Sequence, residues 1–325
     1  MINLTTNYLG LTLKSPLIIS SSGLTNSVDK IRKFEELGAG AVVLKSLFEE
    51  QINYEAGILV ENGLSPEAHD YITGYSKTNA LEDHLKLIER AKKAVKIPVI
   101  ASINCMSASE WVSFAKDIES AGADALELNI FFVASDIEQS SEKYEKLYTD
   151  LIVKIKNVTH VPLSIKIGYH FTNLAGIVNN LYVRGAKGVI LFNRFYEPDI
   201  DIEDMKLTAS GVFSSPADIR QSLRWVGIIS AKVGEIDIAA STGIHDGKAA
   251  IKQILAGAKA VQVCSVIYKK GDEQVKVIND EIATWMSKKG FKTIEEFRGL
   301  LNYSKIPDPS IYERSQFMKY FSNYH

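Results

Sequence analysis

The stretch Gly38-Ala-Gly-Ala-Val-Val-Leu44 recurs in the same pattern at Gly122-Ala-Asp-Ala-Leu-Glu-Leu128, Gly185-Ala-Lys-Gly-Val-Ile-Leu191 and Gly257-Ala-Lys-Ala-Val-Gln-Val263. Each copy follows a stretch with helical periodicity. The glycine suits the C-terminal end of a helix, where φ is positive, and the apolar run after it is typical of a buried parallel strand. The four copies therefore predict four helix-to-strand junctions spread along the whole chain.

Four further apolar runs alternate with these repeats: Leu17–Ser20, Val99–Ser102, Leu163–Lys166 and Ile236–Ala240. Proline precedes three of them, and proline is tolerated at the first residue of a strand. Helical periodicity fills the intervals and predicts these helices: Val28–Leu37, Leu81–Ala94, Trp111–Ser120, Tyr144–Ile155, Asn173–Tyr182, Ala217–Ala231, Lys248–Ala256 and Glu273–Lys288. Eight alternating units predict a (β/α)₈ TIM barrel, with an open doubly wound sheet as the alternative.

Two excursions interrupt this rhythm, residues 47–80 after the second strand and 194–215 after the sixth. Loops that follow barrel strands open on the face where barrel enzymes carry their chemistry, so both are candidate substrate walls. We expect one domain over residues 1–325, ending in a C-terminal helix and arm over about residues 290–325.

The composition excludes several classes of protein. The 325 residues are 46% hydrophobic and 23% charged, and 37 basic residues against 39 acidic ones give a net charge of -2. This balance argues against nucleic-acid and anionic-membrane partners, which favour a basic surplus. No apolar run approaches the roughly 20 residues of a membrane helix, and the start of the sequence lacks a signal pattern. We expect a cytoplasmic protein without a Cys-based metal site, since only Cys105 and Cys264 occur.

Polar residues at the ends of the predicted strands mark the candidate site. The first strands end in Ser20-Ser21-Ser22-Gly23, Lys45-Ser46 and Glu127-Leu128-Asn129, and later ones in Lys166 and Asn193-Arg194. Two buried lysines require anionic partners. Because we expect Glu127 to point away, a bound anion or an electron-rich ring is the better partner for the lysines.

The last two strands end in small-residue turns, Ser241-Thr242-Gly243 and Cys264-Ser265, each followed by a helix. Barrels often hold phosphate at this position, on backbone N–H groups and helix N-termini. The sequence therefore predicts a phosphorylated ligand at the mouth of the barrel, with lysines at its other end.

Taken together and in order, these motifs resemble the dihydroorotate dehydrogenase family of barrels that bind flavin mononucleotide (FMN). The resemblance extends from Asn3 to about Phe297 and is carried by Leu13–Gly23, Lys45-Ser46, Glu127–Asn129, Lys166, Asn193, Ala240–Ile244 and Ala256–Ser265. It implies an oxidoreductase of pyrimidine biosynthesis, similar to the soluble class, that passes hydride between a C–C unit of a small pyrimidine-like substrate and flavin N5. It also implies a homodimer and allows an electron-transfer partner subunit.

Residue by residue, the resemblance assigns three sets. The FMN-binding residues are Ser20, Ser21, Ser22, Gly23, Lys45, Ser46, Asn129, Lys166, Gly211, Ser241, Thr242, Gly243, Cys264 and Ser265. The substrate-binding residues are Lys45, Asn62, Gly63, Leu64, Asn129, Asn193 and Arg194. Lys45 and Lys166 are catalytic, and Lys166 is placed by the N1/O2 edge, where reduced flavin carries negative charge.

Departures from the family pattern concern the proton-transfer and substrate residues. Phe132 stands where the family has a Cys or Ser base, Ala134 replaces a second Asn, and Val60 replaces an Asn of the loop after the second strand. Two substitute bases are candidates. Ser135 lies three residues beyond the expected place, and His170 follows Lys166, histidine being the commonest general base.

Three alternatives therefore stay open. One is a related flavin reductase acting on another substrate, and a second is an inactive flavin-binding homologue. The third is a flavin-free sugar-phosphate lyase that uses Lys166 as a Schiff base.

Overall fold

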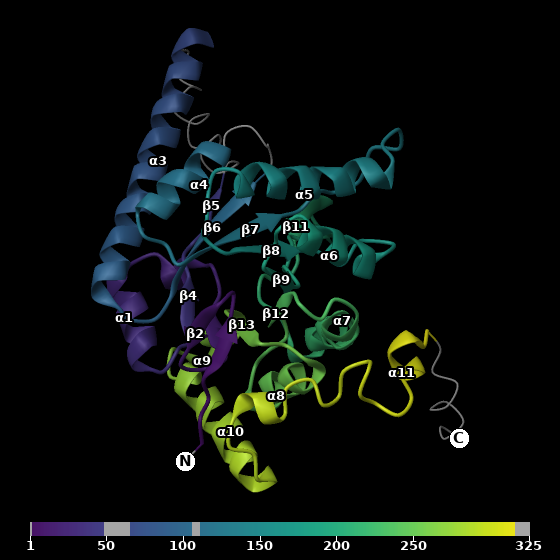
Figure 1. Cartoon of the computed structure of the whole chain (residues 1–325). Helices are drawn as coiled ribbons and strands as arrows, with labels where there is room; N and C mark the ends of the chain where they lie inside the picture. The colour runs from purple at the N-terminus through teal and green to yellow at the C-terminus, as the bar shows by residue number, and fades with distance from the viewer. Residues whose placement is uncertain (1, 49–65, 106–110, 316–325) are drawn as a thin grey trace.

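The structure is a computed structural model that describes residues 2–48, 66–105 and 111–315 (Figure 1). Within this part of the chain, eight parallel strands close into a barrel. They are β3 (Leu17–Ile19), β4 (Ala41–Val43), β6 (Val99–Cys105), β7 (Ala125–Ile130), β8 (Leu163–Ile167), β9 (Gly188–Leu191), β12 (Asp237–Ser241) and β13 (Ala260–Val263). Strand β4 pairs with both β3 and β6, which closes the ring and confirms the predicted TIM barrel.

Helices surround the strands, as Figure 1 shows. The helices expected from periodicity are present as α1 (Val28–Glu36), α3 (Pro66–Ala94), α4 (Trp111–Ser120), α5 (Ser141–Lys156), α6 (Leu174–Val183), α7 (Ile219–Lys232), α8 (Gly247–Ala256) and α10 (Gln274–Lys289). Two further helices are short: α9 (Ser265–Lys270) follows β13, and α11 (Ser310–Glu313) lies in the C-terminal arm. Each predicted boundary holds to within a few residues except at the start of α3.

The excursion after β4 differs from the prediction of a loop over residues 47–80. Leu47 and Phe48 form β5, which pairs with the end of β6, and α3 begins at Pro66 rather than at Leu81. Proline suits the first position of a helix, but apolar periodicity starts only near Leu81, so the sequence carries no amphipathic pattern over the earlier turns. Figure 1 shows these turns extending past the barrel.

The excursion after β9 contains an antiparallel hairpin of β10 (Pro198–Asp201) and β11 (Lys206–Ala209). The Asp201 carboxylate accepts hydrogen bonds from the backbone N–H groups of Glu203 and Asp204 at 3.1 Å each, which fixes the turn. The excursion returns to the barrel through Ser214, so the hairpin stands beside the carboxyl ends of the strands.

A hairpin of β1 (Thr6–Tyr8) and β2 (Leu11–Leu13) closes the other end of the barrel. Tyr8 and Leu9 are fully buried among small and branched side chains from the strands, which include Ile18, Ala41, Ile100, Ala125, Ile190, Ala239 and Ala260. The Asp237 carboxylate accepts from the Leu9 N–H at 2.6 Å and pairs with Lys259 at 2.5 Å. Because the amino ends of the strands are sealed in this way, a cavity inside the barrel must open at their carboxyl ends.

No helix in the described residues is both long enough and apolar enough to cross a membrane.

His84 on α3 is a buried histidine whose neutrality is built into the fold. Its Nε2 has no hydrogen-bond partner among the described residues, and burial lowers its pKa from 6.5 to about 4. The unfolded chain therefore binds a proton below pH 6.5 that the folded chain refuses. The contribution of neutral His84 to folding stability is fully present above pH 6.5 and is lost as the pH falls toward 4.

We predict that the His84 contribution to this loss is about 2–3 kcal/mol between pH 7.5 and pH 4.5. Urea unfolding at the two pH values should show that the unfolding free energy falls less between pH 7.5 and pH 4.5 in His84→Leu than in the wild type. The matched control is His160→Gln, because His160 is exposed; it should keep the wild-type fall. An equal fall in His84→Leu would contradict the prediction.

Candidate active site

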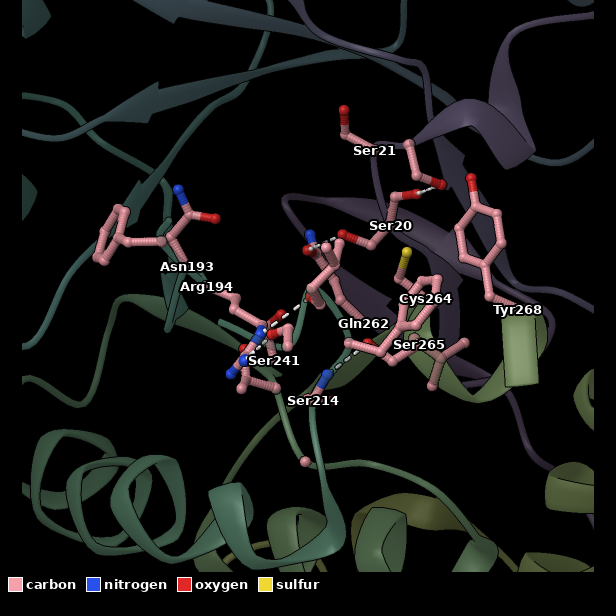
Figure 2. Close-up of a pocket in the computed structure, with 18 of the residues that line it drawn as sticks. Ser20, Ser21, Asn193, Arg194, Ser214, Ser241, Gln262, Cys264, Ser265 and Tyr268 are labelled. Carbon is pink, nitrogen blue, oxygen red and sulfur yellow. Dashed lines mark hydrogen bonds between the residues drawn. The ribbon is translucent and has the colours of Figure 1, made fainter. Parts of the chain in front are cut away.

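A cavity of about 660 Å³ opens at the carboxyl ends of the strands, opposite the β1–β2 hairpin. The predicted site residues that line it are Ser20, Ser21, Ser22, Lys166, Asn193, Arg194, Gly211, Ser241, Thr242, Gly243, Cys264 and Ser265. Figure 2 shows Asn193 and Tyr268 on opposite sides of this group, with Ser20, Gln262 and Cys264 between them. Residues far apart in the sequence therefore meet at one place, as the strand-end rule predicts.

Lys166 forms the charged floor of the cavity. It is buried, and its ammonium donates to Ser20 Oγ at 3.0 Å and to Gln262 Oε1 at 2.9 Å. The amide of Gln262 in turn donates from Nε2 to Glu127 Oε2 at 2.6 Å. These two hydrogen bonds fix the orientation of the Lys166 ammonium group. Its third N–H can therefore donate to a ligand at one defined position in the cavity.

Glu127 corrects one expectation from the sequence. We expected this carboxylate to point away from the lysines, but it lies inside the barrel with Oε1 3.8 Å from Lys166 Nζ. Side chains on a strand alternate, so Glu127 shares the inward face with Asn129 and Ala125. The buried ammonium therefore has a carboxylate partner of its own and does not by itself require a bound anion.

The opposite end of the cavity offers backbone donors. Gly243, after β12, and Ser265, at the start of α9, both line the cavity. Among the described residues, neither N–H has a hydrogen-bond acceptor. Gly243 has φ +80°, and a Cβ there would lie 2.1 Å from the Ile219 backbone nitrogen, so the turn admits only glycine. These features suit an anionic group such as phosphate.

The excursion after β9 is fastened to this end of the cavity by residues that the sequence did not single out. Ser214 donates its N–H to Ser265 Oγ at 3.0 Å, and its hydroxyl lies 3.0 Å from His245 Nε2 (Figure 2 draws Ser214 and Ser265). Lys269 donates to the Ser214 carbonyl at 2.8 Å. Burial, together with Lys269 and Lys270, lowers the pKa of His245. These contacts depend on distant segments, and no local motif announces them.

Arg194 binds its own excursion. Its guanidinium donates to the carbonyls of Gly211 at 2.6 Å and Val212 at 3.1 Å, and lies 3.5 Å from the Asp218 carboxylate. Gly211 itself has open space around it. These contacts show that Arg194 fixes the segment around Gly211 and Val212 in the cavity wall.

Ser46 connects the first three barrel strands without lining the cavity. Its hydroxyl lies 2.8 Å from Ser21 Oγ and 2.7 Å from Ser102 Oγ. Gly23 also lies behind the wall, where a Cβ would be 2.9 Å from the Tyr268 hydroxyl. Both positions hold the loop Ser20–Ser22 in place rather than touch the cavity space.

Asn129 and Asn193 form a pair at the side of the cavity near β7 and β9. Asn193 donates to Asn129 Oδ1 at 2.7 Å, and only Asn193 of the two lines the cavity. Lys45 is half-buried at the end of β4 and lies outside the lining set. The predicted substrate residues Asn62, Gly63 and Leu64 lie outside the described residues.

One of the two candidate substitute bases, His170, lies beside a pair of stacked aromatic rings. Phe131 stacks on Phe195, which lines the cavity, with ring centroids 3.5 Å apart, and the exposed His170 ring lies 6.3 Å from Phe195. Phe132 is half-buried and packs edge-on against Tyr148. Ser135 is exposed on the loop after β7. The described structure thus brings neither His170 nor Ser135 into the cavity lining.

Gln262, Tyr268 and Glu127 complete the set that sequence reasoning missed or misplaced. Gln262 had one available signal, because it is a polar residue in the middle of an apolar strand. Cys264 neighbours Lys166 and Ser22, and burial raises the pKa of its thiol. A raised pKa favours the neutral thiol over the thiolate, although Cys264 is only half-buried and lines the cavity.

Comparison with known proteins agrees with this geometry. The sequence model of the family described as dihydroorotate dehydrogenase matches residues 3–286. The chain belongs to the dihydroorotate dehydrogenase family. By this membership it is an oxidoreductase of the dihydroorotate dehydrogenase type with a flavin cofactor.

Two relatives illustrate the match. The dihydroorotate dehydrogenase B (NAD(+)) catalytic subunit of Thermoplasma volcanium is 29% identical over 308 residues, which cover 92% of this chain and 99% of the relative. The protein of the same name from Methanothermobacter thermautotrophicus is 26% identical over 312 residues, covering 91% and 98%.

The residues present in the cavity fit a flavin. The cavity volume of about 660 Å³ lies within the range of roughly 300–1,000 Å³ that is typical of ligand and cofactor sites. It joins a buried ammonium at one end to unpaired N–H groups at the other, which is the donor set that a phosphorylated ring system with an electron-rich edge requires.

Gly243→Ala should destabilise the protein and weaken flavin binding, because the new Cβ meets the Ile219 backbone at positive φ. We expect a loss of about 2 kcal/mol or more in unfolding free energy. Thermal unfolding and flavin titration would measure the two effects. Gly234→Ala is the matched control, since Gly234 lies outside the cavity lining and its Cβ would meet only the Ser230 carbonyl oxygen, at 4.0 Å. Equal behaviour of the two variants would refute the assignment.

Proposed function

We propose that this chain is an FMN-dependent enzyme that oxidises dihydroorotate, or a closely related pyrimidine-like compound, in pyrimidine biosynthesis. Hydride would leave a C–C unit of the substrate for flavin N5. The observation that carries the proposal is the buried Lys166 ammonium at the floor of a cavity whose other end offers unpaired N–H groups. The family match over residues 3–286 supports it.

The chain supplies two binding regions for the cofactor. Gly243, Ser265 and their neighbours Ser241, Thr242 and Cys264 would hold the phosphate, and Gly211 would lie near the ribityl chain. Ser20–Ser22 and Lys166 would hold the ring, Gly23 and Ser46 would support that loop from behind, and Lys45 and Asn129 would lie on the substrate side. Bound FMN would supply a two-electron acceptor that is negatively charged at its N1/O2 edge when reduced. Lys166 would stabilise that charge.

Substrate and proton would be handled at the side of the cavity near β7 and β9. Asn129 and Asn193, joined at 2.7 Å, would bind the substrate together with Lys45, and the sequence also assigns Asn62, Gly63 and Leu64 to substrate binding. Arg194 would hold the wall beside them. We assign proton removal to His170, which stands one ring behind the wall formed by Phe195, and Ser135 is the second candidate. A general base typically contributes about 10²–10⁴ in rate.

The first experiment is a visible spectrum of the purified protein, followed by anaerobic addition of dihydroorotate. We expect bound FMN that dihydroorotate reduces, and we expect His170→Ala to slow reduction about 100-fold or more without loss of flavin. His160→Ala, at an exposed histidine, is the control.

The other results discriminate the alternatives. Bound flavin that dihydroorotate leaves oxidised would favour a reductase for a less polar substrate, which the stacked Phe131 and Phe195 rings would suit. A protein that cannot be loaded with flavin would refute the proposal. Reduction at the wild-type rate in His170→Ala would transfer the base role to Ser135, tested with Ser135→Ala.

We further propose that the protein is a cytoplasmic homodimer that works with an electron-transfer partner subunit. The relatives from Thermoplasma volcanium and Methanothermobacter thermautotrophicus are named as catalytic subunits, which supports the partner. The β10–β11 hairpin supports the homodimer. It exposes Ile200 (64%), Ile202 (77%), Met205 (87%) and Leu207 (76%), and a concentration of exposed apolar side chains marks an association surface.

The double variant Ile202→Lys/Leu207→Lys should convert the dimer into a monomer, because two ammonium groups would have to be desolvated in the interface. Analytical ultracentrifugation would measure the molecular mass. Val183→Lys on α6, where Val183 is 69% exposed outside the hairpin, is the control and should remain dimeric. A dimer that persists in the double variant would exclude the hairpin from the interface.

A further inference from the structure

A hydrogen-bonded chain of three buried polar side chains extends from the cavity into the interior of the barrel. Lys166 lines the cavity, and its ammonium is bound to Gln262 Oε1 at 2.9 Å. Gln262 Nε2 donates to Glu127 Oε2 at 2.6 Å, and Glu127 Oε1 lies 3.8 Å from Lys166 Nζ. Glu127 is 1% exposed and is not part of the cavity lining. It therefore does not touch the cavity space, and it affects a bound ring by its charge and through its neighbours.

The charge of Glu127 is directed at Lys166. Among the described residues, Oε1 receives no hydrogen bond, so the Lys166 ammonium is the donor group that it faces. Below it lies the hydroxyl of Tyr8, whose pKa is raised well above 10.0 by burial and by the charges of Glu127 and Asp237. The raised pKa favours the neutral phenol, so Tyr8 adds no second negative charge beside Glu127. Cys264, beside Lys166, has a thiol pKa raised by burial and is neutral as well.

A lysine ammonium that is paired with a carboxylate stabilises negative charge on a bound flavin ring less than an unpaired ammonium does. The proposed function places Lys166 where negative charge develops on reduction, and a cation there favours reduction. A carboxylate 3.8 Å behind that cation opposes the same charge through a low-dielectric interior, where such interactions are strong. The amide of Gln262 holds both groups in fixed directions.

We infer that Glu127 is a positioning residue that sets the reduction potential of the bound flavin, by orienting Lys166 through Gln262 and compensating part of its charge. The inference rests on the proposed function, since it presumes a flavin above Lys166. Its consequence is that the cavity holds the reduced ring less tightly than Lys166 alone would. Electrons accepted from a substrate can then leave for the next acceptor.

The test is the midpoint potential of the bound flavin in Glu127→Gln, measured anaerobically at pH 6 by equilibration with reference dyes. Removal of the carboxylate leaves the cation uncompensated and should make the potential more positive. We expect at least a tenfold change in the reduction equilibrium, which for a two-electron couple is about 30 mV. Ser164→Ala is the control, because Ser164 is buried in the same barrel and carries no charge; its potential should equal that of the wild type.

Gln262→Met separates orientation from charge. It removes the amide and keeps both ions, so we expect weaker flavin binding with a smaller change in potential than in Glu127→Gln. If Glu127→Gln does not retain flavin, Glu127→Asp replaces it. The shorter carboxylate retreats from Lys166, and its potential should shift in the same direction by a smaller amount.

The outcomes separate the two proposals. A wild-type chain that binds no flavin overturns the proposed function and this inference with it. A flavin-loaded Glu127→Gln protein, or Glu127→Asp in its place, with an unchanged or more negative potential overturns the inference alone. A purely structural role for Glu127 would lower thermal stability and leave the potential where it is.

Discussion

Burial of the Lys166 ammonium inside the barrel is the interaction on which the rest of the site depends. A buried cation is costly unless its neighbours pair with it, and three strands supply those neighbours: Ser20 after β3, Glu127 on β7 and Gln262 on β13. None of these strands is adjacent to all the others, so the arrangement exists only when the ring is closed. The surroundings of the Lys166 charge thus depend on closure of the barrel.

The two ends of the barrel have opposite roles, and the difference begins in the side chains of the strands. Near the amino ends the inward positions are small or branched, such as Ala41, Ala125 and Ala239, and they receive Tyr8 and Leu9. Near the carboxyl ends the inward positions become Ser, Glu, Lys and Gln, and within residues 2–48, 66–105 and 111–315 no apolar plug covers them. The sealed end supplies rigidity, and the polar end supplies a cavity with fixed donors.

The family assignment and the local chemistry agree at the cofactor side and diverge at the proton-transfer side. The turn at Gly243, the N–H of Ser265 and the ammonium of Lys166 are assembled as a flavin requires. On the loop after β7, Phe131 instead stacks on Phe195 and His170 lies beside both rings, whereas Phe132 packs against Tyr148. Cofactor binding depends on backbone geometry and one charge, whereas substrate recognition depends on individual side chains, so the second can change while the first is kept.

The sequence alone determined the barrel, its strand ends and most of the cavity lining, because strand periodicity and the Gly-Ala repeat are local signals and because all parallel strands of a closed barrel end on one face. It also pointed to Lys166. Only the tertiary structure decided how that lysine is compensated: the sequence placed Glu127 facing away, whereas strand alternation puts it on the same inward face as Asn129, 3.8 Å from Lys166. The Ser214–His245 contact and the stacking of Phe131 on Phe195 before His170 were likewise decided in three dimensions. Each depends on groups separated by many residues, and periodicity carries no information about which distant side chains meet.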